Sequence, residues 1–200
     1  MPTGVALRDV RAQLFEAAER VLLRDGPHAL TSRAVTTEAG CAKGVLHRHF
    51  ADFDAFLAEL VVDRTDRLDD EAAVLRDAAG SGHVVDTLAT ALTALFTSVA
   101  VAIVALVISR DDLRARLRDA RPGPGLPLVT EAAAMIAAYL SVERDLGRLT
   151  AEADVDTLAA TLVGAGHLLF ADRTSAPPEA AAVRSVVASV LTGVVRESPS

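Results

Sequence analysis

Tryptophan is absent from this chain of 200 residues, and tyrosine, cysteine and lysine each occur once. The single cysteine, Cys41, has no partner for an internal disulfide, which fits a reducing compartment. We expect Cys41 to be a small buried side chain, with a redox role as the alternative. Because aromatic residues are so few, the core must be built mainly from Ala, Leu and Val.

Turn-forming residues are also few. The twelve glycines and eight prolines gather at a few places and do not recur at the intervals expected of strands. Ala and Leu favour helix, and 51% of the residues are apolar, which is enough for a sizeable core. The sequence therefore predicts an all-α protein of about nine helices.

Positive charge is scarce overall but is unevenly spread. The net charge is −7, which by itself argues against nucleic-acid binding. Residues 1–50, however, hold seven basic and five acidic side chains, whereas residues 51–200 hold thirteen and twenty-two. The N-terminal quarter thus carries +2 and the remainder −9. This asymmetry indicates a slightly basic N-terminal unit on an acidic body.

The residue patterns that enzymes need are missing. No glycine-rich phosphate loop precedes a predicted helix, and Cys41 has no evident base partner. His47 and His49 stand two positions apart, so on a helix they would point in different directions and could not easily share a metal ion. We therefore expect no catalysis, no metal site and no cofactor.

One uncharged run, from Thr87 to Ser109, is long enough to span a bilayer. Four threonines at positions 87, 90, 93 and 97 would give a helix a polar stripe, and Asp86 and Asp111 make the flanks acidic. We therefore expect a buried central helix, or two helices lining a cavity. The N-terminus has no apolar signal segment, so a cytoplasmic protein is expected.

The segment from Thr31 to Phe50 is typical of two very short helices joined by a tight turn at Gly40. Thr31 can cap the first helix with its hydroxyl, and the second is predicted to begin near Ala42 and to end at Phe50. Helices this short need a scaffold, because nucleation costs more than so few hydrogen bonds return. Lys43, a compact cation at the start of a short helix, suits a phosphate oxygen.

Longer helices are predicted on both sides of this segment. Apolar residues at helical spacing indicate a first helix from about Leu7 to Asp25, ended by Gly26 and Pro27. Asp52 is a suitable N-cap for a helix that ends near residue 77. Further helices are predicted over residues 111–119, 126–146, 154–172 and 177–196.

Several residues of this region form a recognisable pattern. They are Leu30-Thr31 before the second helix, Ala39-Gly40 at the turn, Lys43-Gly44 at the start of the third helix, Leu46, His49 and Phe50 at its end, and the capped helix from Asp52 to Leu57. In this pattern, which covers about a quarter of the chain, the sequence resembles the tetracycline-repressor (TetR) family of bacterial regulators.

The resemblance implies both an organisation and a function. Residues 1–51 would form a helix-turn-helix DNA-binding domain, and residues 52–200 a helical effector-binding and dimerisation domain. A homodimer joined by its last two helices would bind a palindromic operator in double-stranded DNA and repress transcription in the bacterial cytoplasm. A small hydrophobic effector would release it. The alternatives are a DNA-binding regulator without a small-molecule ligand and a regulator tethered to the membrane.

Eight residues are expected to contact DNA: Thr31, Arg33, Lys43, Gly44, Val45, His47, Arg48 and His49. The resemblance implies that Thr31, Lys43, Gly44 and His49 lie near phosphates. Val45 can meet a thymine methyl group, and Arg48 can pair with guanine or with phosphate. This chain has His47 where the family usually has tyrosine, and Ala42 where it usually has a serine or threonine cap.

Two further sites are expected in the C-terminal part. A mostly apolar effector pocket is predicted between the uncharged run and the helix near residues 132–140, although ordinary core packing is an equal alternative. The candidate lining residues are Thr93, Phe96, Thr97, Met135, Tyr139 and His167. A dimer interface is predicted on the last two helices, with packing inside one chain as the alternative. Its candidates are Leu158, Leu162, Gly166, Leu169, Val183, Val187, Val190, Leu191 and Val194.

Overall fold

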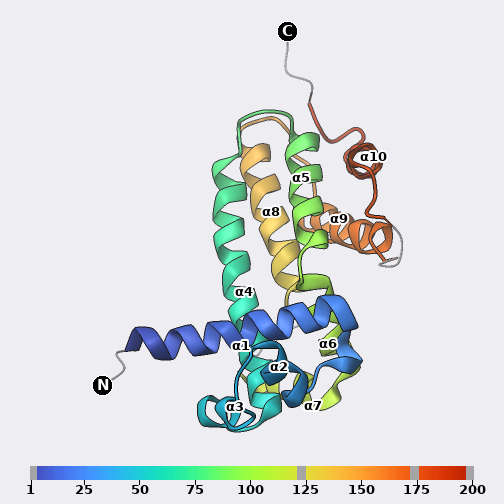
Figure 1. Cartoon of the computed structure of the whole chain (residues 1–200). Coiled ribbons are helices and arrows are strands. Elements are labelled where there is room, and N and C mark those ends of the chain that lie inside the picture. The colour runs from blue at the N-terminus through green and yellow to red at the C-terminus, as the bar shows by residue number, and fades with distance from the viewer. Residues whose placement is uncertain (1–3, 121–124, 172–175, 197–200) are drawn as a thin grey trace. The chain divides into compact units, whose positions relative to one another are not determined.

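The computed structural model describes residues 4–120, 125–171 and 176–196, with side chains from Val10 onward. Within these residues the chain forms ten α-helices, one short 3-10 helix and a single isolated β-bridge, so the all-α prediction is confirmed (Figure 1). The predicted number was about nine, because the uncharged run could be one helix or two. It forms two, α5 (Val84–Thr97) and α6 (Ala100–Ser109).

The described residues fold into two compact units. The first comprises residues 1–64 and 99–124, and the second comprises residues 65–98 and 125–200. One helix, α4 (Phe53–Asp77), contributes residues to both units. The segment 1–51, expected to be the helix-turn-helix domain, lies wholly within the first unit, and a functional boundary at residue 52 stays a prediction.

The first unit is built from short helices around one longer helix. Its further elements are α1 (Gly4–Asp25), the 3-10 helix η1 (Pro27–Ala29), α2 (Ser32–Glu38), α3 (Gly44–His49) and α7 (Asp111–Ala120). Gly26 has φ +79°, a left-handed conformation that ends α1 without strain on a side chain, and Pro27 follows it. Gly26 and Pro27 by themselves therefore account for the turn between α1 and η1.

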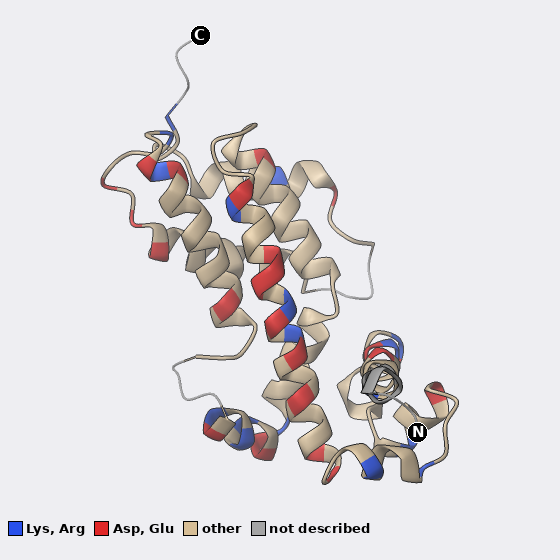
Figure 2. Ribbon diagram, turned by 90° about the vertical axis from the view of Figure 1, so that its left-hand side faces the viewer, with Lys and Arg blue, Asp and Glu red and all other residues tan. Residues whose placement is uncertain are grey.

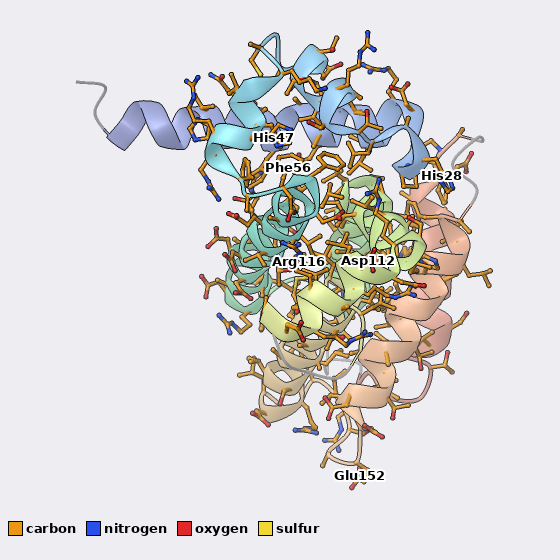
Figure 3. All side chains as sticks on the ribbon, turned by 90° about the horizontal axis from the view of Figure 1, so that it is seen from below. His28, His47, Phe56, Asp112, Arg116 and Glu152 are labelled. Atoms are coloured by element: carbon orange, nitrogen blue, oxygen red, sulfur yellow. The ribbon has the colours of Figure 1, made fainter. Side chains whose placement is uncertain are left out.

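Phenylalanine rings form the centre of this unit. The ring centroids of Phe15, Phe50 and Phe56 lie 5.0 to 5.7 Å apart. Phe15 lies on α1, Phe50 directly follows α3, and Phe56, labelled in Figure 3, lies on α4. Tilted and edge-on rings at this spacing attract one another beyond their simple burial. The cluster thereby joins α1, the end of α3 and the start of α4.

Helix α6 also belongs to the first unit, where it packs against η1 and α1. Its residues Ala102, Ile103 and Leu106 are fully buried. Among the helices of the described part of the chain, none by itself combines the length and the apolar composition needed to cross a membrane. Only α5 and α6 taken together, as a bent pair, pass that test.

The second unit contains the C-terminal part of α4, α5, α8 (Val129–Asp145), α9 (Val155–Leu169) and α10 (Ala180–Val190). Helix α8 packs mainly on α9, and α10 packs mainly on α5, while α5 and α8 run side by side (Figure 1). Phe96 stacks on Phe170 at 5.5 Å and fills the space beside Gly166. A Cβ atom at Gly166 would lie 2.3 Å from the Phe96 ring, so this glycine is required by packing inside the chain.

The helix starts predicted at the caps Thr31 and Asp52 and at residue 154 are confirmed. The side chain of Thr31 accepts a hydrogen bond from the Ala34 amide at 3.1 Å. Asp52 accepts one from the Ala55 amide at 2.6 Å, and Asp154 accepts one from the Thr157 amide at 3.1 Å. Each cap satisfies an amide that the first helical turn leaves unpaired.

The helix ends were predicted less well. The last helix ends at Val190 and not near Arg196, because Gly193 takes φ +76° and the chain then runs antiparallel to residues 148–150. Thr150 N donates to Val194 O, and Arg196 N donates to Arg148 O, each at 2.9 Å. Helix α9 ends at Leu169, and the predicted end at residue 172 lies outside the described residues.

A buried carboxylate supports the loop between α4 and α5. Glu143 on α8 is fully buried, pairs with Arg148 at 3.3 Å and accepts a hydrogen bond from the Gly80 amide at 3.2 Å. The Arg148 guanidinium also donates to the carbonyl of Gly82. Both ends of this ion pair thus hold the same loop, which fixes the chain just before α5.

Candidate functional site

The helix-turn-helix segment has the geometry that its sequence predicts. Gly40 has φ +65°, and the Cys41 amide donates to the Thr36 carbonyl at 3.0 Å, which closes the turn after α2. Helix α3 begins at Gly44 and not at Ala42, so it is shorter than predicted. Cys41 was expected to be buried, but it is a free thiol with intermediate exposure.

The predicted DNA contacts lie on an accessible surface of the first unit. Six of the eight side chains or backbone positions are exposed, and they are Thr31, Arg33, Lys43, Gly44, His47 and Arg48. Val45 and His49 are partly buried. No residue of the described chain covers the cationic side of α3, so this surface can meet a partner.

Helix α3 is held by its apolar side. Leu46 is the one fully buried residue within it, and Phe50, which follows the helix, is also buried. Arg11 on α1 adds a polar contact, because its guanidinium donates to the His49 carbonyl at 3.2 Å and lies 4.4 Å from the centre of the Phe50 ring. Arg11 also pairs with Glu59 of α4. This residue positions the end of α3 and was not predicted, because its partners are far away in sequence.

A second arginine ties α6 and α7 to the helix-turn-helix. Arg110, between these two helices, donates to the Leu30 carbonyl at 3.1 Å and lies 3.5 Å from the Asp54 carboxylate. Leu30 directly precedes the Thr31 cap of α2, and Asp54 is in the first turn of α4. Arg110 therefore fixes the chain on both sides of the α2–α3 pair.

Further ion pairs surround the same segment. Arg116 on α7, labelled in Figure 3, reaches Asp52 at 3.1 Å. The Ala55 amide, together with Arg116, lowers the pKa of the Asp52 carboxyl. Arg20 and Arg24 on α1 each lie 2.8 Å from Glu38 at the end of α2, and they lower the pKa of Glu38. These groups are exposed, so each pair contributes little alone.

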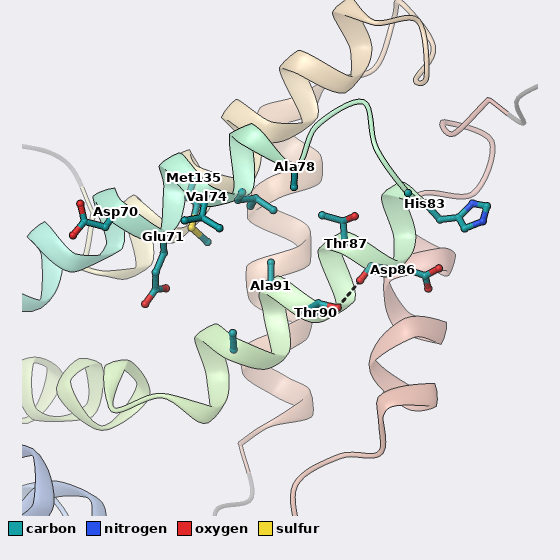
Figure 4. A pocket seen from close by; sticks show the side chains of 13 residues that line it. Asp70, Glu71, Val74, Ala78, His83, Asp86, Thr87, Thr90, Ala91 and Met135 are labelled. Atoms are coloured by element: carbon teal, nitrogen blue, oxygen red, sulfur yellow. Dashed lines mark hydrogen bonds between the residues drawn. The ribbon is translucent and has the colours of Figure 1, made fainter.

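The second unit contains an open cleft of about 840 Å³ between α4 and α5 (Figure 4). Its lining comes from α4, the following loop, α5 and one residue of α8. The lining residues are Asp70, Glu71, Val74, Leu75, Ala78, Gly82, His83, Asp86, Thr87, Thr90, Ala91, Ala94 and Met135. A cleft of this size suits a drug-sized molecule.

Of the six residues predicted to line a pocket, Met135 is part of this cleft. Thr93 and Thr97 donate hydrogen bonds to carbonyls of their own helix, and Phe96 packs on Phe170. Tyr139 is completely buried in the core, and His167 is exposed on α9. Residues 87, 90, 91 and 94 of α5 face the cleft instead, because three- and four-residue steps keep them on one side of the helix.

The predicted dimer residues fall into two groups. Five are already buried within the chain, and they are Leu162, Gly166, Val183, Val187 and Leu191. Leu158, Leu169, Val190 and Val194 are partly exposed. The sequence reading missed Leu168 on α9, which is 79% exposed. An interface on α9 and α10 stays a prediction. The partly exposed residues, together with Leu168, are the apolar side chains of these helices that a partner could contact.

Comparison with known proteins bears on the first unit most directly. Residues 14–60 match the family model described as bacterial regulatory proteins of the tetR family. The matched segment contains α2, α3 and the parts of α1 and α4 that hold them. Over these residues the chain is similar to the tetR family of bacterial regulatory proteins.

Solved structures show that the TetR-like fold extends over nearly the whole chain. A Mesorhizobium loti protein assigned to the TetR-family transcriptional regulators is 17% identical, with 94% of this chain and 98% of that one covered and a TM-score of 0.69. The fatty acid degradation regulator FadR of Bacillus halodurans is 17% identical over 92% and 95%, with a TM-score of 0.68. No curated protein sequence matches the chain.

One similar structure was solved with a ligand. FadR of Bacillus subtilis, in complex with stearoyl-CoA, is 16% identical over 91% of this chain and 98% of that one, with a TM-score of 0.64. At this identity the likeness concerns the fold, which is that of TetR-family regulators.

The contacts of Arg110 predict a measurable loss of stability. Replacing Arg110 with Ala removes the hydrogen bond to Leu30 and the ion pair with Asp54, and should lower the free energy of unfolding by about 1 to 3 kcal/mol. Arg118→Ala, on the exposed side of α7, is the matched control and should change it by less than about 0.5 kcal/mol. Urea unfolding followed by circular dichroism measures both, and equal effects would contradict the assignment.

The single tyrosine gives a second prediction. Burial, and then the neighbouring Glu143, raise the pKa of Tyr139 above its ordinary value of 10.0. The folded protein therefore holds this proton more tightly than the unfolded chain, and the resulting stability is complete below pH 10.0 and is lost as the pH rises through the folded-state pKa.

Tyrosinate absorbance checks this directly, because the chain has no tryptophan and no other tyrosine. The absorbance should stay flat through the ordinary pKa and rise together with alkaline unfolding. Tyr139→Phe should abolish the signal. Ionisation at the ordinary pKa in the folded protein would show that the hydroxyl is accessible to water.

Proposed function

We propose that this protein is a ligand-responsive transcriptional regulator that binds DNA as a homodimer, most simply a repressor released from its operator by a small molecule. The observation that carries the proposal is the exposed cationic side of α3 in a chain whose net charge is −7. Lys43, at the N-cap of α3, and Arg48, within the helix, are both exposed and form no ion pair with any residue of the described chain. A DNA duplex is the partner that this charge fits best.

Gly44 supports the same conclusion from a different direction. It has an ordinary helical φ, and a Cβ atom added there would meet nothing within 4 Å. The folded chain therefore gives no reason for glycine at this position. A DNA backbone passing close to the start of α3, beside Lys43, supplies one.

The proposed contacts follow from the exposed residues. A helix of the size of α3 fits the major groove, where base edges differ. Lys43, Thr31 and Arg33 would hold phosphates, while Val45 would meet a thymine methyl and Arg48 a guanine or a phosphate. His47 and His49 would help to position the helix.

Dimerisation would let two α3 helices contact the same duplex, and two helices bind more specifically than one helix alone. Two copies of α3 related by a twofold axis would read half-sites about 34 to 36 Å apart in a palindromic operator. The partly exposed apolar residues of α9 and α10, together with Leu168, are the proposed contact. Gly164 lies on the same helix, and nothing lies within 4 Å of a Cβ atom placed there, so a partner helix could approach closely.

Control by a small molecule is supported by the cleft and by α4. The C-terminal part of this helix lines the cleft with Asp70, Glu71, Val74 and Leu75, and its N-terminal part contributes Phe56 to the first unit. A ligand that favours one arrangement of α4 would shift the population of DNA-competent molecules. The FadR structure with stearoyl-CoA shows that a protein of this fold can hold a small molecule.

Lys43→Ala tests DNA binding. The full-length protein is first used to capture genomic fragments, and binding to the selected duplex is then measured by fluorescence anisotropy at several salt concentrations. Lys43→Ala should weaken binding to all duplexes similarly and lower the slope of log K against log salt by about 1 for each protomer. Arg76→Ala, on the part of α4 in the second unit, removes the same charge and should leave the slope unchanged. A wild-type protein that shows no salt-sensitive preference for any duplex would contradict the proposal.

Gly44→Ala separates function from folding. Because the added methyl group meets no protein atom, the free energy of unfolding should stay unchanged or rise by up to about 1 kcal/mol. Binding to the operator should fall by about tenfold or more, since the methyl group would displace the phosphate backbone. Thermal unfolding and anisotropy on the same sample decide the point. Unchanged DNA affinity would remove Gly44 from the interface.

A further inference from the structure

The charges around the cleft in the second unit are all of one sign. Its thirteen lining residues include the carboxylates of Asp70, Glu71 and Asp86, and none of them is lysine or arginine. The only other ionisable group is His83. A ligand that enters this cleft therefore meets negative charge at its opening.

The three carboxylates are not equivalent. Asp86 forms an ion pair with Arg184 of α10, which neutralises it. Neither Asp70 nor Glu71 forms an ion pair with any residue of the described chain, and both are exposed. Figure 4 shows the Glu71 side chain extending from α4 toward α5, whereas Asp86 and His83 extend away from the cleft. The available negative charge is thus on α4, and Glu71 carries it toward the space between the helices.

The walls of the cleft are apolar. Leu75 and Met135 are buried at its base, and the small residues Ala78, Ala91 and Ala94 leave room between the helices. Val74 beside them is 71% exposed, which leaves an apolar side chain facing water. The Thr90 hydroxyl is already used, because it donates to the Asp86 carbonyl at 2.9 Å. An apolar group inserted here would gain from burial without breaking a polar contact.

We propose that this cleft binds a hydrophobic compound with a single positive charge, such as an organic ammonium with an aliphatic tail. This inference rests on the proposed function, of which it names the effector class. The tail would cover Val74, Leu75 and Met135, and the ammonium would lie near Glu71 and Asp70. A polyanionic ligand such as an acyl-CoA has no lysine or arginine to receive its phosphates here and would be repelled by two unpaired carboxylates.

The test compares three compounds with the same tail: decyltrimethylammonium, decanol and decyl sulfate, each well below micelle-forming concentration. Calorimetry on the 200-residue protein measures the affinity of each compound, and anisotropy measures release from the captured operator. The ammonium should bind about five- to twentyfold more tightly than decanol, and this preference should shrink as salt is added. Decyl sulfate or an acyl-CoA as the best ligand would overturn the proposal.

Variants on one helix provide the matched control. Glu71→Gln should lower the affinity for the ammonium compound by about two- to fivefold. The double variant Glu71→Gln/Asp70→Asn should lower this affinity further, while the affinity for decanol stays unchanged. Asp69→Asn removes the same charge from an exposed neighbour that does not line the cleft, and should have no effect. Equal losses in Asp69→Asn and Glu71→Gln would show that only the overall charge matters and would overturn the assignment.

The outcomes also separate the two proposals. If the wild-type protein binds the ammonium more tightly than decanol and decyl sulfate but binds no duplex, the proposed ligand class stands and the regulator proposal fails. If it binds its operator and prefers the neutral or anionic compound, the regulator proposal stands and the effector class fails.

Discussion

The proposed DNA-binding surface depends on the burial of one leucine. Helix α3 has only six residues, too few to be stable alone, and it offers a single fully buried side chain, Leu46, to the rest of the unit. Phe50 immediately after it joins the rings of Phe15 and Phe56. Polar contacts add to this packing. Arg11 donates to the His49 carbonyl at the end of α3, and Arg110 holds Leu30 before α2 and Asp54 in α4.

Charged residues are distributed unevenly between α3, which is cationic, and the rest of the chain, which is acidic. Along α4, acidic residues and arginines are interspersed (Figure 2), and those in the C-terminal part, such as Asp70, Glu71 and Arg76, are exposed. Arginines of the first unit are largely engaged by neighbouring carboxylates, as Arg20, Arg24 and Arg116 show. Lys43 and Arg48 stand apart from these pairs, and their charge remains available to an external anion.

The features that could be predicted from the sequence are those that depend on neighbours along the chain. Caps at Thr31, Asp52 and Asp154 act over three residues, and Gly26 and Gly40 end helices through their own backbone. The helix-turn-helix was predictable for the same reason. Its supports were not, because Arg110 reaches a carbonyl eighty residues away and nothing in its local sequence indicates that contact.

The residues that line the cleft could not be predicted from the sequence either. The four threonines of α5 looked like one stripe, yet only Thr87 and Thr90 line the cleft, which the C-terminal part of α4 covers on its other side. The apolar residues of α10 were also ambiguous, because Val183 and Val187 could cover their own chain or a partner. The structure buries both against their own chain, a choice that depends on the packing of α10 on α5.

The two compact units are interlaced along the chain and do not follow one another. The backbone leaves the first unit within α4, returns to it at residue 99 and leaves again after residue 120. A fragment cut after α4 would therefore lack α6, whose Ile103 and Leu106 cover apolar surface of η1 and α1. The unit that contains the helix-turn-helix is consequently not a detachable module, because it completes its fold only after more than half of the polypeptide has been synthesised.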